Sequence, residues 1–144
     1  MTDRIISTVI DRQNVITLGP DTSVRHAAIV MAENRIGAVP VVNDDRLLGI
    51  FSERDLMGRV VAHGLDTDAT TIGQVMTPTP ITVSSNRPMT HALHIMHESG
   101  FRHLPVVDHG KVIGMVSARD AQPFELADFG ETVPFRESVL ENLR

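Results

Sequence analysis

The sequence contains two copies of one pattern, and this internal repeat limits the possible folds more than any other feature. Residues 39–42 (VPVV) resemble residues 104–107 (LPVV), and residues 49–55 (GIFSERD) resemble residues 114–120 (GMVSARD), each pair 65 residues apart. The same offset aligns further pairs: Ile16-Thr17 with Ile81-Thr82, His26-Ala27 with His91-Ala92, Met31 with Met96, and Glu33 with Glu98. A register shared by so many separated pairs predicts two similar structural units.

Each copy has the pattern of strand, helix, strand, strand, helix. In the first copy we expect strands at 14–18, 38–42 and 47–51 and helices at 24–33 and 53–62, with Ser23 as the N-cap of the first helix. In the second copy we expect strands at 80–83, 101–107 and 111–116, with Pro88 opening a helix where its missing N–H does no harm.

We therefore predict an α/β (α+β) fold of two pseudo-symmetric β-α-β-β-α units packed sheet to sheet. A unit of about 55 residues buries too little surface to be comfortably stable alone, and packing two together solves that problem. The expected domains are 1–64 and 71–122, joined by a linker at 65–70 and followed by a C-terminal extension at 123–144. The extension contains Phe124, Phe129 and an amphipathic stretch at 135–143, and we expect it to pack on the module or on a partner subunit.

The helix at 24–33 predicts a homodimer. Its residues 27–32 are apolar on every face, which indicates burial on more than one side. One side is expected to face its own sheet, and the other to face a second subunit.

Composition excludes several classes of function. The net charge is -5 and no run of Lys and Arg stands out, so we expect neither nucleic-acid nor anionic-membrane binding. The absence of Cys excludes disulfides, thiolate nucleophiles and cysteine zinc sites. The longest apolar run has six residues and the N-terminus lacks the apolar region of a signal peptide, so we expect a cytoplasmic protein without a membrane span.

The two motifs, an apolar VPVV or LPVV strand followed by GIFSERD or GMVSARD, resemble the CBS-domain family over about residues 7–121. The resemblance implies a tandem pair called a Bateman module, often a disc-shaped homodimer. It also implies binding of an adenosine-containing ligand, such as AMP, ADP, ATP, NAD or S-adenosylmethionine, in the cleft between the paired units. Many members regulate an attached enzyme, channel or transporter; here we expect the module to stand alone and to signal to a partner protein.

A serine and an aspartate three residues apart lie at the end of a strand and the start of a helix in each copy, as Ser52 with Asp55 and Ser117 with Asp120. A helix N-terminus offers free N–H groups and a positive dipole end to a phosphate, and the serine hydroxyl can add a hydrogen bond. The aspartate can accept hydrogen bonds from both ribose hydroxyls, and the resemblance implies these same roles. A capping box that only stabilises the helix start is the alternative, and both roles can coexist.

Basic residues near these turns are further candidates. Arg54 and Arg119 repeat, and each either reaches a phosphate or forms a surface ion pair. Arg102 and His103 have only Gly37 and Ala38 as counterparts, so we expect unequal sites, with this pair marking the more phosphate-selective one or else lying on a solvated strand edge. If His103 faces a phosphate, nucleotide affinity is expected to strengthen as pH falls near 6.5.

Other chemistry has weaker support. His91, His94 and His97 follow a drifting helical stripe and are expected to be structural rather than zinc ligands. No nucleophile elbow, Walker loop or dinucleotide glycine pattern is present, so we expect no enzyme activity. The alternatives that stay open are an interaction module with degenerate ligand sites and an undetected enzyme.

Overall fold

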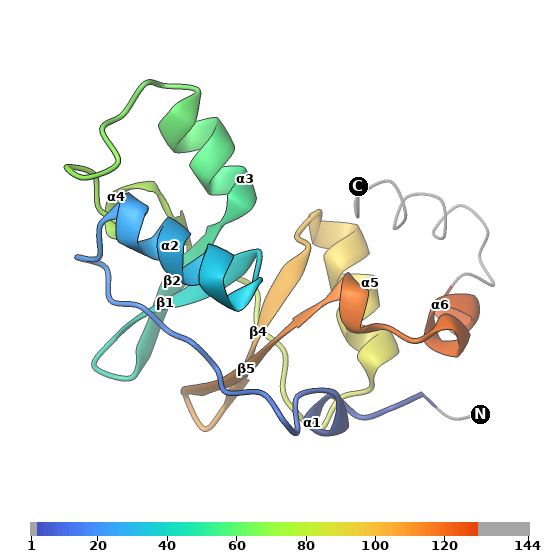
Figure 1. The fold of residues 1–144 in the computed structure, drawn as a ribbon. Coiled ribbons are helices and arrows are strands. Elements are labelled where there is room, and N and C mark those ends of the chain that lie inside the picture. Colours follow the sequence, from blue (N-terminus) through green and yellow to red (C-terminus); the bar gives the residue numbers. More distant parts are fainter. Residues whose placement is uncertain (1–2, 130–144) are drawn as a thin grey trace. The chain divides into compact units, whose positions relative to one another are not determined.

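The structure is a computed structural model that describes residues 3–129 (Figure 1). The residues divide into two compact units. We call Val15–Pro80 with Gly110–Val112 the first-repeat unit, and the remaining described residues the second-repeat unit. In the described part of the chain no helix combines the length and the apolar character that crossing a bilayer requires.

The first-repeat unit is a small sheet with helices packed against it. Its elements are α2 (Val24–Asn34), β1 (Ala38–Asn43), β2 (Arg46–Ser52), α3 (Glu53–Asp55), the π-helix η1 (Leu56–Val61), α4 (Ile72–Val75) and β3 (Thr77–Pro78). The strands are antiparallel in the order β1-β2-β3, with Pro40 opposite Ile50. Asp44 and Asp45 both have positive φ, which is the backbone of a tight hairpin turn. The core contains Val24, Ala27, Met31, Val39, Val41, Phe51, Val60, Ile72 and Val75.

The second-repeat unit repeats this plan with two changes: its sheet has two strands instead of three, and its end differs. Its elements are α1 (Ile6–Val9), α5 (Met89–Ser99), β4 (His103–Asp108), most of β5 (Lys111–Ser117), the short 3-10 helix η2 (Ala118–Asp120) and α6 (Pro123–Phe129). The chain leaves the helical conformation at Ala121, so α6 is a separate helix, and it packs on α5. The core contains Ile6, Ile10, Val83, Met89, Ala92, Leu93, Met96, Leu104, Val106, Val116 and Ala118.

The predicted α+β fold is confirmed, with differences at the edges of the elements. The helix expected at 24–33 is α2, and the Ser23 side chain accepts a hydrogen bond from His26 N, 3.0 Å away, as the expected N-cap. The helix expected at 53–62 is α3 followed by η1. The strands expected at 14–18 and 80–83 are reduced to single parallel bridges, Leu18 with Val41 and Val83 with Val106, because each segment pairs over only one residue.

Short segments are exchanged between the repeats. The residues around α1 precede the first repeat in sequence but fold into the second-repeat unit, where Met89 N donates to Arg4 O at 2.8 Å. The residues around α4 precede the second repeat but fold into the first-repeat unit, where Val24 N donates to Thr70 O at 2.9 Å. The units defined by contacts are therefore not consecutive along the chain. The predicted domain boundaries at 1–64 and 71–122 describe the two copies of the repeat along the sequence, and they stay a prediction.

The repeated glycines Gly49 and Gly114 are explained by this exchange. A Cβ atom on Gly49 would lie 2.6 Å from Thr77 O, and one on Gly114 would lie 2.8 Å from Ile10 Cδ1. Each glycine thus lets an exchanged segment approach its strand closely.

Two expectations about packing stay predictions. In α2, Ala27 and Met31 face the core, whereas Ile29 is 45% exposed, so a second subunit on that face is not tested. In the C-terminal extension, α6 lies within the described residues, and the amphipathic stretch at 135–143 lies outside them.

Candidate functional site

The first-repeat turn, Ser52 to Asp55, is a complete capping box at the end of β2. Ser52 N and Ser52 Oγ donate to Asp55 Oδ2 at 2.9 and 3.0 Å, and Asp55 N donates back to Ser52 Oγ at 3.2 Å. Strand β2 delivers Ser52 in an extended conformation and α3 begins at the next residue, so the sequence pattern alone produces this arrangement.

The carboxylate of Asp55 is already bound within its own unit. Asp55 is only 5% exposed. Its Oδ1 atom accepts a hydrogen bond from Thr77 Oγ1 at 3.0 Å and lies 3.6 Å from Arg59 Nε. Both oxygens of Asp55 therefore have partners, and the burial of this side chain leaves little access for a ligand hydroxyl.

The second-repeat turn, Ser117 to Asp120, is also a capping box but is more open. Ser117 N donates to Asp120 Oδ2 at 2.7 Å, and Ser117 Oγ donates to the same oxygen at 3.4 Å. Asp120 is partly exposed. Within residues 3–129 no hydrogen bond reaches its second oxygen, Oδ1, so that atom can accept a hydrogen bond from a ligand without losing another partner.

Both turns therefore have the local geometry of the capping alternative, and the roles of the serines and aspartates toward a ligand stay predictions. The repeated arginines beside them, Arg54 and Arg119, are both exposed. Among the described residues neither forms an ion pair, so the expected surface ion pair is not seen for either one.

The basic pair Arg102 and His103 is half-buried at the start of β4 rather than on a solvated edge. Burial, followed by the positive charges of Arg119 and Arg102, lowers the pKa of His103 to about 4. Without ligand, the expectation that His103 titrates near pH 6.5 is thus wrong, because a buried imidazole beside two guanidinium groups resists a further positive charge. The expected strengthening of nucleotide affinity as pH falls stays a prediction. The three residues form a basic cluster that includes a member of the second-repeat turn.

The histidines of α5 differ in environment along the helix. His91 is partly buried, and burial, followed by the charges of Arg87 and His94, lowers its pKa. Within the described residues no group of three or more His, Asp or Glu side chains could hold a metal ion. The structural interpretation of His91, His94 and His97 stays a prediction.

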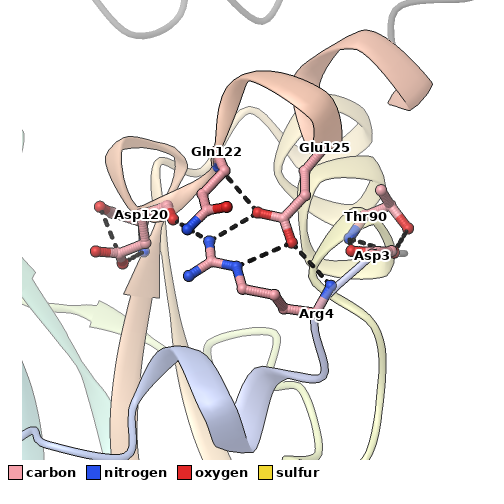
Figure 2. Close-up of polar contacts among 7 residues, drawn as sticks. Asp3, Arg4, Thr90, Asp120, Gln122 and Glu125 are labelled. Atoms are coloured by element: carbon pink, nitrogen blue, oxygen red, sulfur yellow. Dashed lines mark hydrogen bonds and ion pairs between the residues drawn. The ribbon is translucent and has the colours of Figure 1, made fainter. Parts of the chain in front are cut away.

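Sequence reasoning missed four residues that hold these turns. Thr77 and Arg59 bind Asp55, and Arg4 and Glu125 bind one another beside Asp120 (Figure 2). The invariance of Gly49 and Gly114 between the repeats was the available signal that a segment packs on each strand. No local signal could have joined Arg4 to Glu125, because 121 residues separate them.

Comparison with known proteins agrees with this architecture. The model of the CBS domain matches twice, at residues 6–62 and 72–122. The CBS domain-containing protein CBSCBSPB1 of Arabidopsis thaliana is 36% identical over 129 residues, which are 88% of this chain and 24% of that protein. The chain thus spans about a quarter of the length of that relative.

Solved structures match over nearly their whole length. The CBS domain protein PAE2072 of Pyrobaculum aerophilum, complexed with AMP, is 28% identical with a TM-score of 0.80, over 89% of this chain and 99% of that one. The CBS domain pair of protein MJ0100, in complex with 5-methylthioadenosine and S-adenosyl-L-methionine, is 25% identical with a TM-score of 0.73, over 83% and 93%. The chain therefore belongs to the CBS domain family and carries the domain twice.

Proposed function

We propose that this chain is a regulatory module that binds an adenosine-containing ligand at its Ser-x-x-Asp turns and signals occupancy to a partner protein. The aspartate accepts hydrogen bonds from the ribose hydroxyls, and the serine and the adjacent helix N-terminus bind phosphate. Structures of similar CBS pairs with AMP, or with 5-methylthioadenosine and S-adenosyl-L-methionine, support this ligand class.

One observation carries most of the weight: among the contacts of residues 3–129, none of the hydrogen bonds to the Asp120 carboxylate uses its Oδ1 atom. A ribose presents two neighbouring hydroxyl donors, and a carboxylate whose first oxygen is held by Ser117 offers its second in a fixed direction. A charged acceptor held in this way contributes about 1.5–3 kcal/mol per hydrogen bond to a ligand. The basic cluster of Arg102, His103 and Arg119 lies in the same unit, where Arg102 and Arg119 offer positive charge to a phosphate and the neutral His103 offers a ring N–H.

The two turns are proposed to be unequal. A ligand at Asp55 must compete with Thr77 and Arg59 for a buried Oδ1, whereas no hydrogen-bond partner within residues 3–129 competes for Oδ1 of Asp120. The second-repeat turn is therefore the stronger ribose acceptor, in line with the expected phosphate selectivity of Arg102 and His103.

The test combines native mass spectrometry with calorimetric titration of the full chain. A co-purifying nucleotide would identify itself by mass, and AMP, ATP, NAD and S-adenosylmethionine would be titrated into stripped protein. At a hundredfold excess over Kd, a ligand should stabilise the fold by about 2.7 kcal/mol. Asp120→Asn should weaken binding while the protein stays folded. Absence of binding by all four ligands would overturn the proposal.

A second function, that of an interaction module with degenerate ligand sites, is favoured by the internal pairing of Asp55. We propose a homodimer under both functions, the ligand-binding module and the interaction module. Ile29, Met57 and Val61 are 45%, 66% and 65% exposed in the first-repeat unit and offer an apolar contact. Light scattering of the ligand-free chain, in which a dimer is twice 15.8 kDa, tests the dimer separately from ligand binding.

A further inference from the structure

The second-repeat turn ends differently from its counterpart. In the first-repeat unit, α3 continues into η1, so the turn is the start of a longer helical segment. In the second-repeat unit η2 ends at Asp120, and Ala121 is extended. The Asp120 carbonyl instead accepts a hydrogen bond from Arg4 Nη2 at 2.7 Å. A residue 116 positions away in sequence thus holds the residue proposed to bind ribose.

The guanidinium of Arg4 is held in turn by Glu125 in α6 (Figure 2). Arg4 Nη2 donates to Glu125 Oε1 at 2.7 Å, and Arg4 Nε donates to Oε2 at 3.2 Å. The backbone atoms Arg4 N and Gln122 N donate to the same carboxylate at 3.0 and 2.9 Å. The Glu125 side chain is fully buried and that of Arg4 is 24% exposed, so this two-point pair is partly shielded from water.

Glu125 keeps its charge despite its burial. Burial raises the pKa of Glu125, but the hydrogen bonds from Arg4 and from Gln122 N together lower it to below its usual value. The Glu125 carboxylate is therefore ionised at neutral pH and forms an ion pair with Arg4.

The segment that carries Arg4 is itself anchored. Arg4 O accepts a hydrogen bond from Met89 N at the start of α5. The Asp3 carboxylate accepts hydrogen bonds from Thr90 N, 3.2 Å away, and from Thr90 Oγ1. Arg4 thus joins three elements of one unit, namely the Asp120 turn, α6 and the start of α5.

The first-repeat unit has no equivalent link. The hydrogen bond from Val24 N to Thr70 O corresponds to that from Met89 N to Arg4 O, so Thr70 occupies the place of Arg4. A threonine cannot span two partners as a guanidinium does. The connection between turn and terminal helix is therefore a property of the second repeat.

We propose that Arg4 is a positioning residue whose bridge between the Asp120 carbonyl and Glu125 couples ligand binding at the second-repeat turn to the docking of α6. This inference rests on the proposed function. Because coupling is reciprocal, a ligand that fixes the turn stabilises α6, and loss of the α6 anchor weakens the ligand. Helix α6 is then the element through which occupancy of this site is passed on.

The experiment measures amide hydrogen exchange of residues 123–129 in the full-length wild-type chain with and without AMP. AMP is expected to slow exchange in this segment. In Arg4→Met the AMP effect on the segment should disappear, and calorimetry should show AMP affinity at least about fivefold weaker. Arg4→Lys should recover part of the AMP effect on exchange and part of the AMP affinity. A lysine ammonium can bridge Asp120 O and Glu125 Oε1, but it cannot form the two-point pair with the Glu125 carboxylate.

The matched control is Arg25→Met, which removes an arginine from the exposed pair with Asp68 in the first-repeat unit. Its AMP affinity and AMP-dependent exchange should equal those of the wild type. A purely structural role of Arg4 would speed exchange without ligand and leave the AMP-dependent change intact, which would overturn the coupling. If Arg4→Met does not fold, the wild-type measurement still tests whether AMP binding is coupled to α6, and Arg4→Lys tests the role of Arg4 in that coupling.

The two proposals fail in different ways. If AMP binds but leaves exchange at 123–129 unchanged, the coupling is wrong and the proposed function stands. If the wild type binds none of AMP, ATP, NAD and S-adenosylmethionine, the proposed function and the coupling both fall.

Discussion

The two Ser-x-x-Asp turns have nearly the same sequence and the same capping box, yet their aspartates differ in burial and in hydrogen-bond partners. Asp55 is buried, and both of its oxygens have partners, including Thr77 and Arg59. Asp120 is partly exposed with one oxygen available, and its backbone carbonyl is tied to Arg4. The comparison teaches that a repeated motif specifies the local turn, whereas residues from distant segments decide how exposed its aspartate is and which partners its carboxylate has.

The largest expected effect concerns the anchor of the second turn. Glu125→Ala leaves the Arg4 charge without its buried partner and should lower the free energy of unfolding by about 3 kcal/mol. The control Asp68→Ala breaks a pair whose side chains are 64% and 66% exposed, and it should change stability by less than about 1 kcal/mol. Urea unfolding measures both. Equal losses would mean that the second turn has no special anchor.

The basic cluster, which only the second repeat has, should make stability depend on pH. The folded-state pKa of His103 is lowered to about 4, so the unfolded chain binds more protons between that value and about 6.5. Stability from this group is present above pH 6.5 and is lost as pH falls toward 4. Between pH 7 and 5 the wild type should lose about 2 kcal/mol more than His103→Asn.

Urea unfolding at pH 7, 6 and 5 measures this difference in stability. At these pH values Glu125 stays ionised in the folded chain, because its pKa is lowered, so its protonation does not interfere. Parallel pH profiles for the wild type and His103→Asn would show that the imidazole is not held neutral in the folded state.

The ligand comparison itself is tested by matched substitutions. Asp120→Asn should weaken AMP binding about tenfold or more, because a charged acceptor of the ribose is replaced by an amide. Asp55→Asn should change AMP binding less, because its carboxylate already has partners, and should instead reduce stability. Calorimetric titration compares the two variants directly. A greater loss of affinity in Asp55→Asn would reverse the order of the sites.

The smallest expected effect comes from a substitution that makes the first turn more like the second. Thr77→Val keeps the side-chain shape and removes the hydroxyl that donates to Asp55 Oδ1. In an Asp120→Asn background, AMP should then bind the first turn about fivefold more tightly, which corresponds to about one hydrogen bond of 1 kcal/mol. The exposed Thr17→Val serves as the control and should have no effect. Unchanged or weaker binding in Thr77→Val would indicate that Thr77 does not compete with the ligand.

Much of the fold was predictable because local patterns carry it. The offset of 65 residues identified the two units, Ser23 marked the start of α2, and the apolar runs at 38–42 and 101–107 became β1 and β4. The strands expected at 14–18 and 80–83 were overestimated, since a short apolar run does not reveal how many of its residues find a partner. The titration of His103 was placed too high, because a pKa depends on burial and on neighbouring charges that one segment does not contain.

The sequence by itself determined that the chain has two repeats, that each turn begins with a serine cap, and that the aspartate lies three residues on. These features depend on contacts within a few residues, where covalent connection alone keeps the groups close. Only the tertiary structure decided that α1 and α4 exchange between the repeats, that Thr77 engages Asp55, and that Arg4 joins Asp120 to Glu125. Contacts across 22 and 121 residues require the whole unit to be folded, because only the packed core brings such distant side chains within hydrogen-bonding distance.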